Sequence, residues 1–336
     1  ADINWNDLAW SPTLGLFAAV SETGAGNRVM TSPDGITWTS RTTNDNNWRG
    51  VAWSPELSLF VATGWSGTGN RVMTSPDGIT WTTRTSAADR QWWGVAWSPT
   101  LGLFAAVAVE LTGLETDLVM TSPDGIVWTS RTTTTNQWRD ITWSPALGLF
   151  VAVSQKGTAN DVMTSPDGIT WTTRTPAANL LWTGIAWSPD LALFVAVASS
   201  GVGNRVMTSP DGITWTTRTS AADNNWASVA WSPELQLFAA VAVTGTGNRI
   251  MTSADGITWM TRASPADNSW SSVAWSPQRG LFAAVANSGT SNRVMTNATA
   301  LQSCSRLNIV MDTQRPHLIW IQDILGLYRS TIIWSN

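Results

Sequence analysis

The sequence is poor in the residues that build most catalytic and metal sites. Its 336 residues include one cysteine (Cys304), one histidine (His317) and one tyrosine (Tyr328). A single cysteine excludes an internal disulfide framework and a cysteine-based zinc site. A single histidine excludes multi-histidine metal centres and most histidine relays. We therefore expect neither a metal nor a cofactor.

Charge and long apolar runs are also scarce. Charged residues make up 12% of the chain, and the formal net charge is -4. A protein without a basic field has little attraction for a phosphate backbone, so nucleic acid is not an expected partner. No apolar run approaches the roughly 18 residues that a membrane-spanning helix needs. We expect no membrane span.

Tryptophan, in contrast, is abundant: the chain has 24, and they repeat. The triplet Trp-Ser-Pro occurs seven times at spacings of 43 to 46 residues, and each of the seven phenylalanines follows one of these tryptophans by seven positions. A constant period in the low forties is typical of solenoids, arrays and propellers. The triplets begin at Trp10, Trp53, Trp97, Trp143, Trp187, Trp231 and Trp275.

The secondary-structure pattern within one unit decides between these architectures. Residues 182–219 contain four short runs rich in β-branched and aromatic residues, separated by turn sequences such as Ser-Pro-Asp-Gly. No segment has the length or the 3.6-residue period of a helix. Four antiparallel strands in a unit of about 44 residues are the blade of a β-propeller. We predict an all-β propeller with seven blades, or eight as the alternative, over residues 1–298. We expect a divergent tail over 299–336 to complete or cap the last blade, with residues 300–312 completing the seventh blade.

The third turn of the unit carries a known signature. Ser32 to Trp38, with the sequence Ser-Pro-Asp-Gly-Ile-Thr-Trp, resembles the Asp-box, or bacterial neuraminidase repeat. Asp-box propellers include sialidases, other glycoside hydrolases, sortilin-like receptors and photosystem assembly factors. The resemblance covers residues 1–297 and implies a hairpin between the third and fourth strands of each blade. It predicts a structural role for the aspartates, which would accept hydrogen bonds from turn amides. These are Asp34, Asp77, Asp124, Asp167, Asp211 and Asp255.

The near-identity of the units argues against an enzyme. A sialidase-like site would need an arginine cluster, a tyrosine nucleophile and a carboxylate, but the single tyrosine lies in the tail and the arginines recur with the repeat. The third unit has one local carboxylate group in a lengthened loop, Glu110, Glu115 and Asp117. We interpret it as an exposed acidic loop, with a calcium site or a glycosidase pair as alternatives.

Two repeated features fall on the face opposite the Asp-boxes. One is a tryptophan five residues before each Trp-Ser-Pro, and the other is an Asn-Arg pair in the loop after the second strand. Indole faces beside amide and guanidinium groups suit sugar binding. In a regular strand the odd offset puts this tryptophan out of phase with the tryptophan of the triplet, so the two need not share a core layer. The alternative is that the tryptophans fill the gaps between blades. The candidate ligand-binding residues are Trp48, Trp92, Trp138, Trp182, Trp226, Trp270, Asn27, Arg28, Asn70, Arg71, Asn204, Arg205, Asn248 and Arg249.

The function predicted from these features is lectin-like, multivalent and non-catalytic recognition of surface glycans. A protein-interaction scaffold with a protein partner is the alternative, and a glycoside hydrolase is the remote one. Such a lectin would act outside the cell or on a cell or virion surface. Equivalent tryptophan-polar pockets around the ring would favour the lectin. An apolar patch on one face would favour the scaffold, and divergent acidic residues at the channel mouth would favour the enzyme. The oligomeric state is left open.

Overall fold

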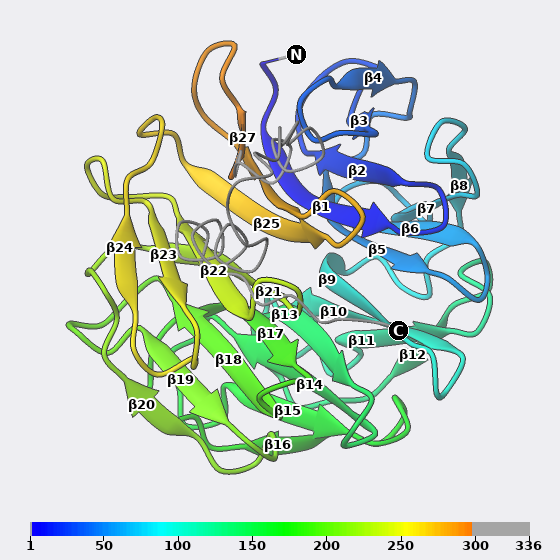
Figure 1. Ribbon diagram of the computed structural model, residues 1–336. Helices are drawn as coiled ribbons and strands as arrows, with labels where there is room; N and C mark the ends of the chain where they lie inside the picture. The colour runs from blue at the N-terminus through cyan, green and yellow to red at the C-terminus, as the bar shows by residue number, and fades with distance from the viewer. Residues whose placement is uncertain (1, 298–336) are drawn as a thin grey trace, which may run out of the picture. The chain divides into compact units, whose positions relative to one another are not determined.

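The computed structural model describes residues 2–297, which form seven antiparallel sheets arranged around one axis (Figure 1). Six sheets have four strands, in chain order from the axis to the rim, and the seventh has three strands within the described residues. The predicted all-β propeller with seven blades is confirmed. The residues expected to complete the seventh blade, 300–312, lie outside the described part of the chain, as does the rest of the tail.

The strands occupy equivalent positions in every blade. The innermost strands are β1 (Trp5–Ser11), β5 (Trp48–Ser54), β9 (Gln91–Ser98), β13 (Trp138–Ser144), β17 (Trp182–Ser188), β21 (Trp226–Ser232) and β25 (Trp270–Ser276). The second strands are β2 (Leu16–Ser21), β6 (Leu59–Gly64), β10 (Leu103–Val109), β14 (Leu149–Ser154), β18 (Leu193–Ala198), β22 (Leu237–Ala242) and β26 (Leu281–Ala286). The third are β3 (Val29–Ser32), β7 (Val72–Ser75), β11 (Val119–Ser122), β15 (Val162–Ser165), β19 (Val206–Ser209), β23 (Ile250–Ser253) and β27 (Val294–Thr296). The outer strands are β4 (Thr39–Arg41), β8 (Thr82–Arg84), β12 (Thr129–Arg131), β16 (Thr172–Arg174), β20 (Thr216–Arg218) and β24 (Met260–Arg262).

The core lies between blades, because each sheet buries both of its faces. Side chains alternate along a strand, so one face of a blade carries its large residues and the other its small ones. Between the first two blades, Trp48, Phe60 and Met73 of the second pack against Ala18 and Val20 of the first. Each blade therefore depends on its neighbour, and the ring must close to cover both end blades.

A β-bulge near the start of every innermost strand sets which tryptophans are buried. In the first blade Trp5 pairs with Ser21 and Asp7 with Val20, so the first strand carries one extra residue. Trp5 and Trp10 are five residues apart, and a regular strand would point them to opposite faces. The extra residue restores their phase, and both join the same buried cluster. The expectation that the two tryptophans of a blade need not share a core layer is wrong for this reason.

The ring closes between the seventh and first blades through contacts of the same kind as elsewhere. Strand β25 lies beside β1. The Ser271 hydroxyl donates to the Trp5 carbonyl at 2.6 Å, and the Ser291 amide donates to the Asp2 carboxylate at 2.7 Å. The residues Ala1–Asn297 accordingly form one compact unit.

Candidate functional site

The seven tryptophans that precede the Trp-Ser-Pro triplets lie in the core. Each is at most 1% exposed. The indole N–H of Trp182 donates to the Ala178 carbonyl at 3.1 Å, and that of Trp226 donates to Ala222 at 3.1 Å. The prediction that these residues are sugar platforms is therefore wrong, because the bulge turns their faces into the gap between blades. The correction applies to Trp48, Trp92, Trp138, Trp182, Trp226 and Trp270.

The Asn-Arg pairs shape the loops that follow the second strands. The Arg205 side chain donates from Nε to the Gly201 carbonyl at 2.9 Å and from one terminal nitrogen to Asn225 of the next blade at 2.9 Å. Its Nε lies 3.7 Å from the Asp223 carboxylate. The bond to Gly201 holds the loop of its own blade, while the contacts with Asn225 and Asp223 fasten that loop to the next blade. Arg28, Arg71 and Arg249 make the same bond from Nε to the carbonyl four residues earlier.

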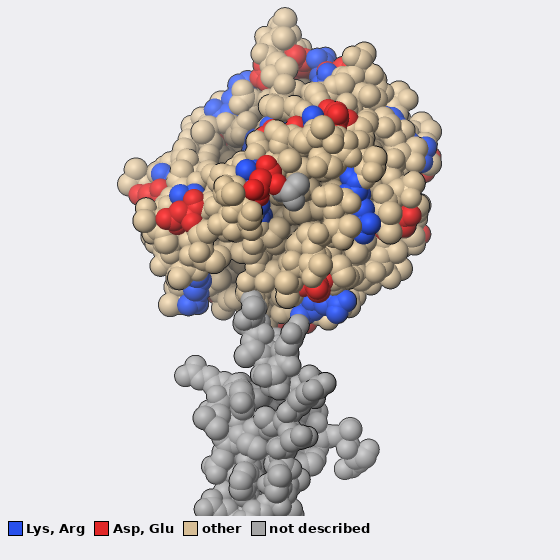
Figure 2. All heavy atoms as spheres, turned by 90° about the horizontal axis from the view of Figure 1, so that it is seen from above, with Lys and Arg blue, Asp and Glu red and all other residues tan. Residues whose placement is uncertain are grey.

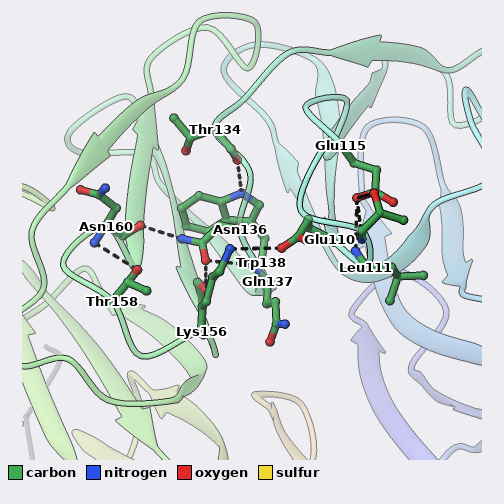
Figure 3. Close-up of polar contacts among 12 residues, drawn as sticks. Glu110, Leu111, Glu115, Thr134, Asn136, Gln137, Trp138, Lys156, Thr158 and Asn160 are labelled. Atoms are coloured by element: carbon green, nitrogen blue, oxygen red, sulfur yellow. Dashed lines mark hydrogen bonds and ion pairs between the residues drawn. The ribbon is translucent and has the colours of Figure 1, made fainter.

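The carboxylates of the third unit are not an exposed acidic loop. Glu110 and Glu115 are buried. Lys156 of the next blade pairs with Glu110 at 3.2 Å (Figure 3), and Arg90 pairs with Glu115 at 3.4 Å and with Asp117 at 2.7 Å. The hydrogen bond from the Thr112 amide is the main cause that lowers the pKa of Glu115 to about 2. These ion pairs hold the loop of the third unit to Arg90 of its own blade and to Lys156 of the next blade.

The Asp-box aspartates organise their turns as predicted. Asp77 accepts hydrogen bonds from the Ile79 amide at 2.8 Å, the Thr80 amide at 2.7 Å and the Ser75 hydroxyl at 3.0 Å. The Trp81 indole closes the turn by donating to the Gly78 carbonyl at 3.0 Å. An added Cβ on Gly78 would lie 2.7 Å from Leu16, so each Asp-box packs beside the turn between the first and second strands of the preceding blade.

These two sets of turns form what we call the Asp-box face: the turns between first and second strands and those between third and fourth strands. Eleven of its aliphatic side chains are between 36 and 66% exposed. Figure 2 draws the rim of the ring rather than this face, and on the rim charged groups are separated by wide uncharged areas. The exposed aliphatic residues are Leu14, Leu57, Leu101, Leu147 and Leu191 in the first set, and Ile36, Ile79, Ile126, Ile169, Ile213 and Ile257 in the second.

The same face is acidic. Besides the six Asp-box carboxylates, its turns carry Glu56, Asp190 and Glu234, whereas Arg279 is the basic residue that they hold within residues 2–297. Turn hydrogen bonds keep the pKa of each Asp-box carboxyl below its usual value although partial burial opposes them, so these groups stay ionised at neutral pH. The Asp-box face thus combines exposed aliphatic side chains with negative charge.

The central channel, at the end opposite the Asp-box face, is where the blades differ from one another. The two residues after each buried tryptophan point toward the axis or the next blade, and they read Asn-Asp, Arg-Gly, Trp-Gly, Arg-Asp, Thr-Gly, Ala-Ser and Ser-Ser in chain order. All of them except Gly184 line a cavity of about 120 Å³. This divergence was not predicted, because the parts of the repeat that are alike in every unit dominate the sequence pattern. In the sequence, the divergence of the blades at the channel is visible at the two positions that follow each buried tryptophan.

Two arginines and two tryptophans stack along one side of this channel. The Arg49 guanidinium lies 4.1 Å from the Trp65 ring centre and 4.3 Å from that of Trp93, and it pairs with Glu22. The Arg139 guanidinium lies 3.4 Å from the Trp93 ring centre. Trp93 is therefore held between two cations, each stabilised by the negative face of a ring.

Two half-buried carboxyl groups line the same cavity. Asp140 accepts hydrogen bonds from the amides of Ile141 and Ile185, each at 2.9 Å. Asp7 accepts from the Ser272 hydroxyl at 2.6 Å and the Val51 amide at 2.9 Å, so each carboxyl joins adjacent blades. Burial is the main cause that raises the pKa of Asp140 to about 7, and the charge of Asp7 adds to it. Burial also raises the pKa of Asp7.

Gly50 and Gly94 allow the inner strands to approach closely at this end. A Cβ on Gly50 would collide with the Trp93 carbonyl, and one on Gly94 would lie 2.9 Å from the Asp140 Cα. Within residues 2–297 no group of three metal-ligating side chains is found, and no helix is long and apolar enough to cross a membrane.

The comparisons with known proteins bear on the fold. No protein-family model matches this chain, and no curated protein matches its sequence. Among solved structures, a streptogramin B lyase is similar with a TM-score of 0.69 and 11% identity, covering 85% of this chain and 91% of that one. A chain of the mitotic checkpoint complex is similar with a TM-score of 0.64 and 16% identity, covering 85% of this chain and 84% of that one. The Cps50 (Swd1) β-propeller domain of Myceliophteria thermophila is similar with a TM-score of 0.60 and 13% identity, covering 84% of this chain and 93% of that one. At these identities the likeness shows a shared propeller fold.

Proposed function

We propose that this protein is a non-catalytic interaction scaffold whose Asp-box face binds a partner protein with an apolar and basic surface. The observation that carries the proposal is the ring of exposed aliphatic side chains, repeated from blade to blade on one face. Exposed apolar patches rimmed by polar residues are typical of interaction sites. The carbohydrate interpretation rested on indole faces, and those indoles lie in the core.

The charge of the Asp-box face indicates the chemistry of the partner. Aliphatic side chains would supply the buried centre of an interface, while the surrounding carboxylates would attract Lys and Arg and speed association. Of the structurally similar chains, one belongs to a mitotic checkpoint complex, one is the β-propeller domain of Cps50 (Swd1) and one is a streptogramin B lyase. Their similarity supports the proposal at the level of fold.

A displayed library of random peptides tests this proposal directly. We expect selection on the wild-type protein to enrich peptides that combine aliphatic residues with Lys or Arg, and their binding to weaken as salt is raised. The double variant Ile79→Glu with Ile169→Glu should lose that binding, since both side chains are about half exposed on the Asp-box face. The matched control is Val202→Glu, which changes a side chain that is 85% exposed in a loop of the opposite face.

Three outcomes would contradict the scaffold. One is a selection without any enriched class, and another is equal binding by the double variant and the wild type. The third is loss of binding only in the Val202→Glu control, which would place the site on the opposite face. A glycan array run in parallel addresses the lectin, because specific glycan binding by the wild type would restore that interpretation through residues other than the seven buried tryptophans.

A further inference from the structure

The channel end opposite the Asp-box face collects hydrogen-bond donors that lack acceptors. The indole N–H groups of Trp65 and Trp93 and the Nε of Arg49 are buried, and none has a hydrogen-bond partner within residues 2–297. Buried polar groups in folded proteins nearly always have a partner, so an unpaired group points to a bound water, ion or ligand. Because all three groups are donors, the missing partner is an acceptor.

Arg139 adds a fourth unpaired donor group at the same place. Its guanidinium stacks on Trp93 and lines the cavity of about 120 Å³, and no hydrogen bond or ion pair reaches it from the described residues. A guanidinium presents its N–H groups in a planar fork that matches two oxygens of a carboxylate or phosphate. Stacking on the ring holds that fork in place before a ligand arrives.

The charges around the cavity favour an anion as well. Glu22 neutralises Arg49 through a direct ion pair, whereas Arg139 has no direct ion pair within residues 2–297 and interacts with Asp140 and Glu22 only at longer range. Burial and the charge of Arg49 lower the pKa of Arg139 to about 9, still well above neutral, so the guanidinium stays positive. The two carboxyls of the cavity, Asp7 and Asp140, have raised pKa values and use their oxygens on neighbouring backbone amides and a serine.

We propose that the mouth of the central channel binds a small oxyanion, a carboxylate or a phosphate, through the Arg139 guanidinium and the Trp93 indole N–H. Arg49 supports the site from behind by fixing the other face of Trp93. Cations are disfavoured, because the unpaired groups are donors. This site lies at the opposite end of the ring from the Asp-box face, so its test is independent of the scaffold.

Isothermal titration calorimetry of the full chain at constant ionic strength tests the site. The probes are inorganic phosphate, acetate and acetamide, the last being a neutral match for acetate. We expect saturable heat with at least one of the two anions and none with acetamide. Binding of phosphate alone assigns the site to phosphate ligands, and binding of acetate alone assigns it to carboxylates; either result supports the proposal.

Arg139→Gln should weaken anion binding about ten- to a hundredfold, the range expected for losing a charge-assisted hydrogen bond. The control Arg279→Gln removes the same charge from an exposed position on the Asp-box face and should bind like the wild type. Trp93→Phe keeps a ring between the two arginines but removes the N–H, and it should also bind more weakly.

The proposal fails if neither anion binds at tens of millimolar, if acetamide binds as well as acetate, or if Arg139→Gln retains the wild-type affinity. Should Arg139→Gln not fold, as judged by circular dichroism, wild-type affinity in Trp93→Phe overturns the proposal in its place. The comparison of acetate with acetamide on the wild-type protein needs no variant and decides the matter if neither variant folds.

Discussion

The tryptophans of the Trp-Ser-Pro triplets differ between blades in one hydrogen bond, and this difference allows the contribution of that bond to stability to be tested. In four blades the indole N–H donates to a side chain three residues after the equivalent tryptophan of the preceding blade. In the other three blades the indole N–H of Trp53, Trp143 or Trp187 is buried without a partner within residues 2–297. The acceptors are Gln278, Glu56, Asp190 and Glu234, and the corresponding residues in the three remaining cases are Thr13, Thr100 and Ala146.

Ala146→Gln should therefore stabilise the protein. Gln278 already makes this contact with Trp10 at 2.6 Å, so a glutamine has the required reach. One added hydrogen bond contributes about 0.5–1.5 kcal/mol net, and ordering the glutamine side chain removes part of that gain. We expect about 0.5–1 kcal/mol, which for a domain of this size raises the melting temperature by about 1–3 °C. Glutamine is preferred to glutamate because it adds no charge to an acidic face.

The assay compares melting temperatures by calorimetry under identical scan conditions. Ala146→Met is the matched control, since methionine is of similar length but offers no strong acceptor. A double-mutant cycle isolates the contact: Trp187→Phe keeps an aromatic ring in the core but removes the N–H, so Ala146→Gln should lose its benefit in that background. The reasoning is refuted if methionine stabilises as much as glutamine, or if the gain persists in the Trp187→Phe protein.

Three further results are expected. Trp226→Ala should lower the free energy of unfolding by about 3–5 kcal/mol, measured by denaturant titration, because it empties a fully buried site; an unchanged midpoint would mean that the indole is not a core residue. Acetate affinity at the channel should fall as pH rises through about 7, because Asp140 loses its proton there while Arg139 keeps its charge. Asp140→Asn should flatten this profile, and a wild-type profile that is already flat would contradict the assignment. The amides of Thr80 and Ile79 lower the pKa of Asp77 although partial burial opposes them. The stability that its carboxylate adds is therefore present above the unfolded pKa of about 4 and is lost as pH falls through the lower pKa of the folded state. The difference in unfolding free energy between the wild type and Asp77→Asn should accordingly shrink in acid, and a difference that grows there would contradict this reasoning.

The repeat carries enough information to predict the architecture without coordinates. A period of about 44 residues, four β-rich runs and a turn signature in each unit allow little besides a propeller, because each run must bury both faces against a neighbouring blade. The Asp-box turns were predictable for a related reason: their hydrogen bonds join residues two or three positions apart, so local sequence determines them.

The placement of the tryptophans depended on a feature that alternation could not reveal. Trp5 and Trp10 share a core layer only because a bulge inserts one residue between them. Small or short polar residues two positions after each buried tryptophan, such as Gly50 and Asp140, accompany the bulge, but their purpose is clear only when the neighbouring blade is in place.

The channel site is the part that tertiary structure alone decided. Glu22, Arg49, Trp93 and Arg139 come from four different blades, and within its own repeat each looks like ordinary variation. Closing the ring brings the same position of all seven units to one axis, where differences between units become a single asymmetric cluster. Local sequence specifies the blade and its turns because those contacts are short in the chain, whereas charge and burial at the channel arise from residues of successive blades, which meet only when those blades pack together.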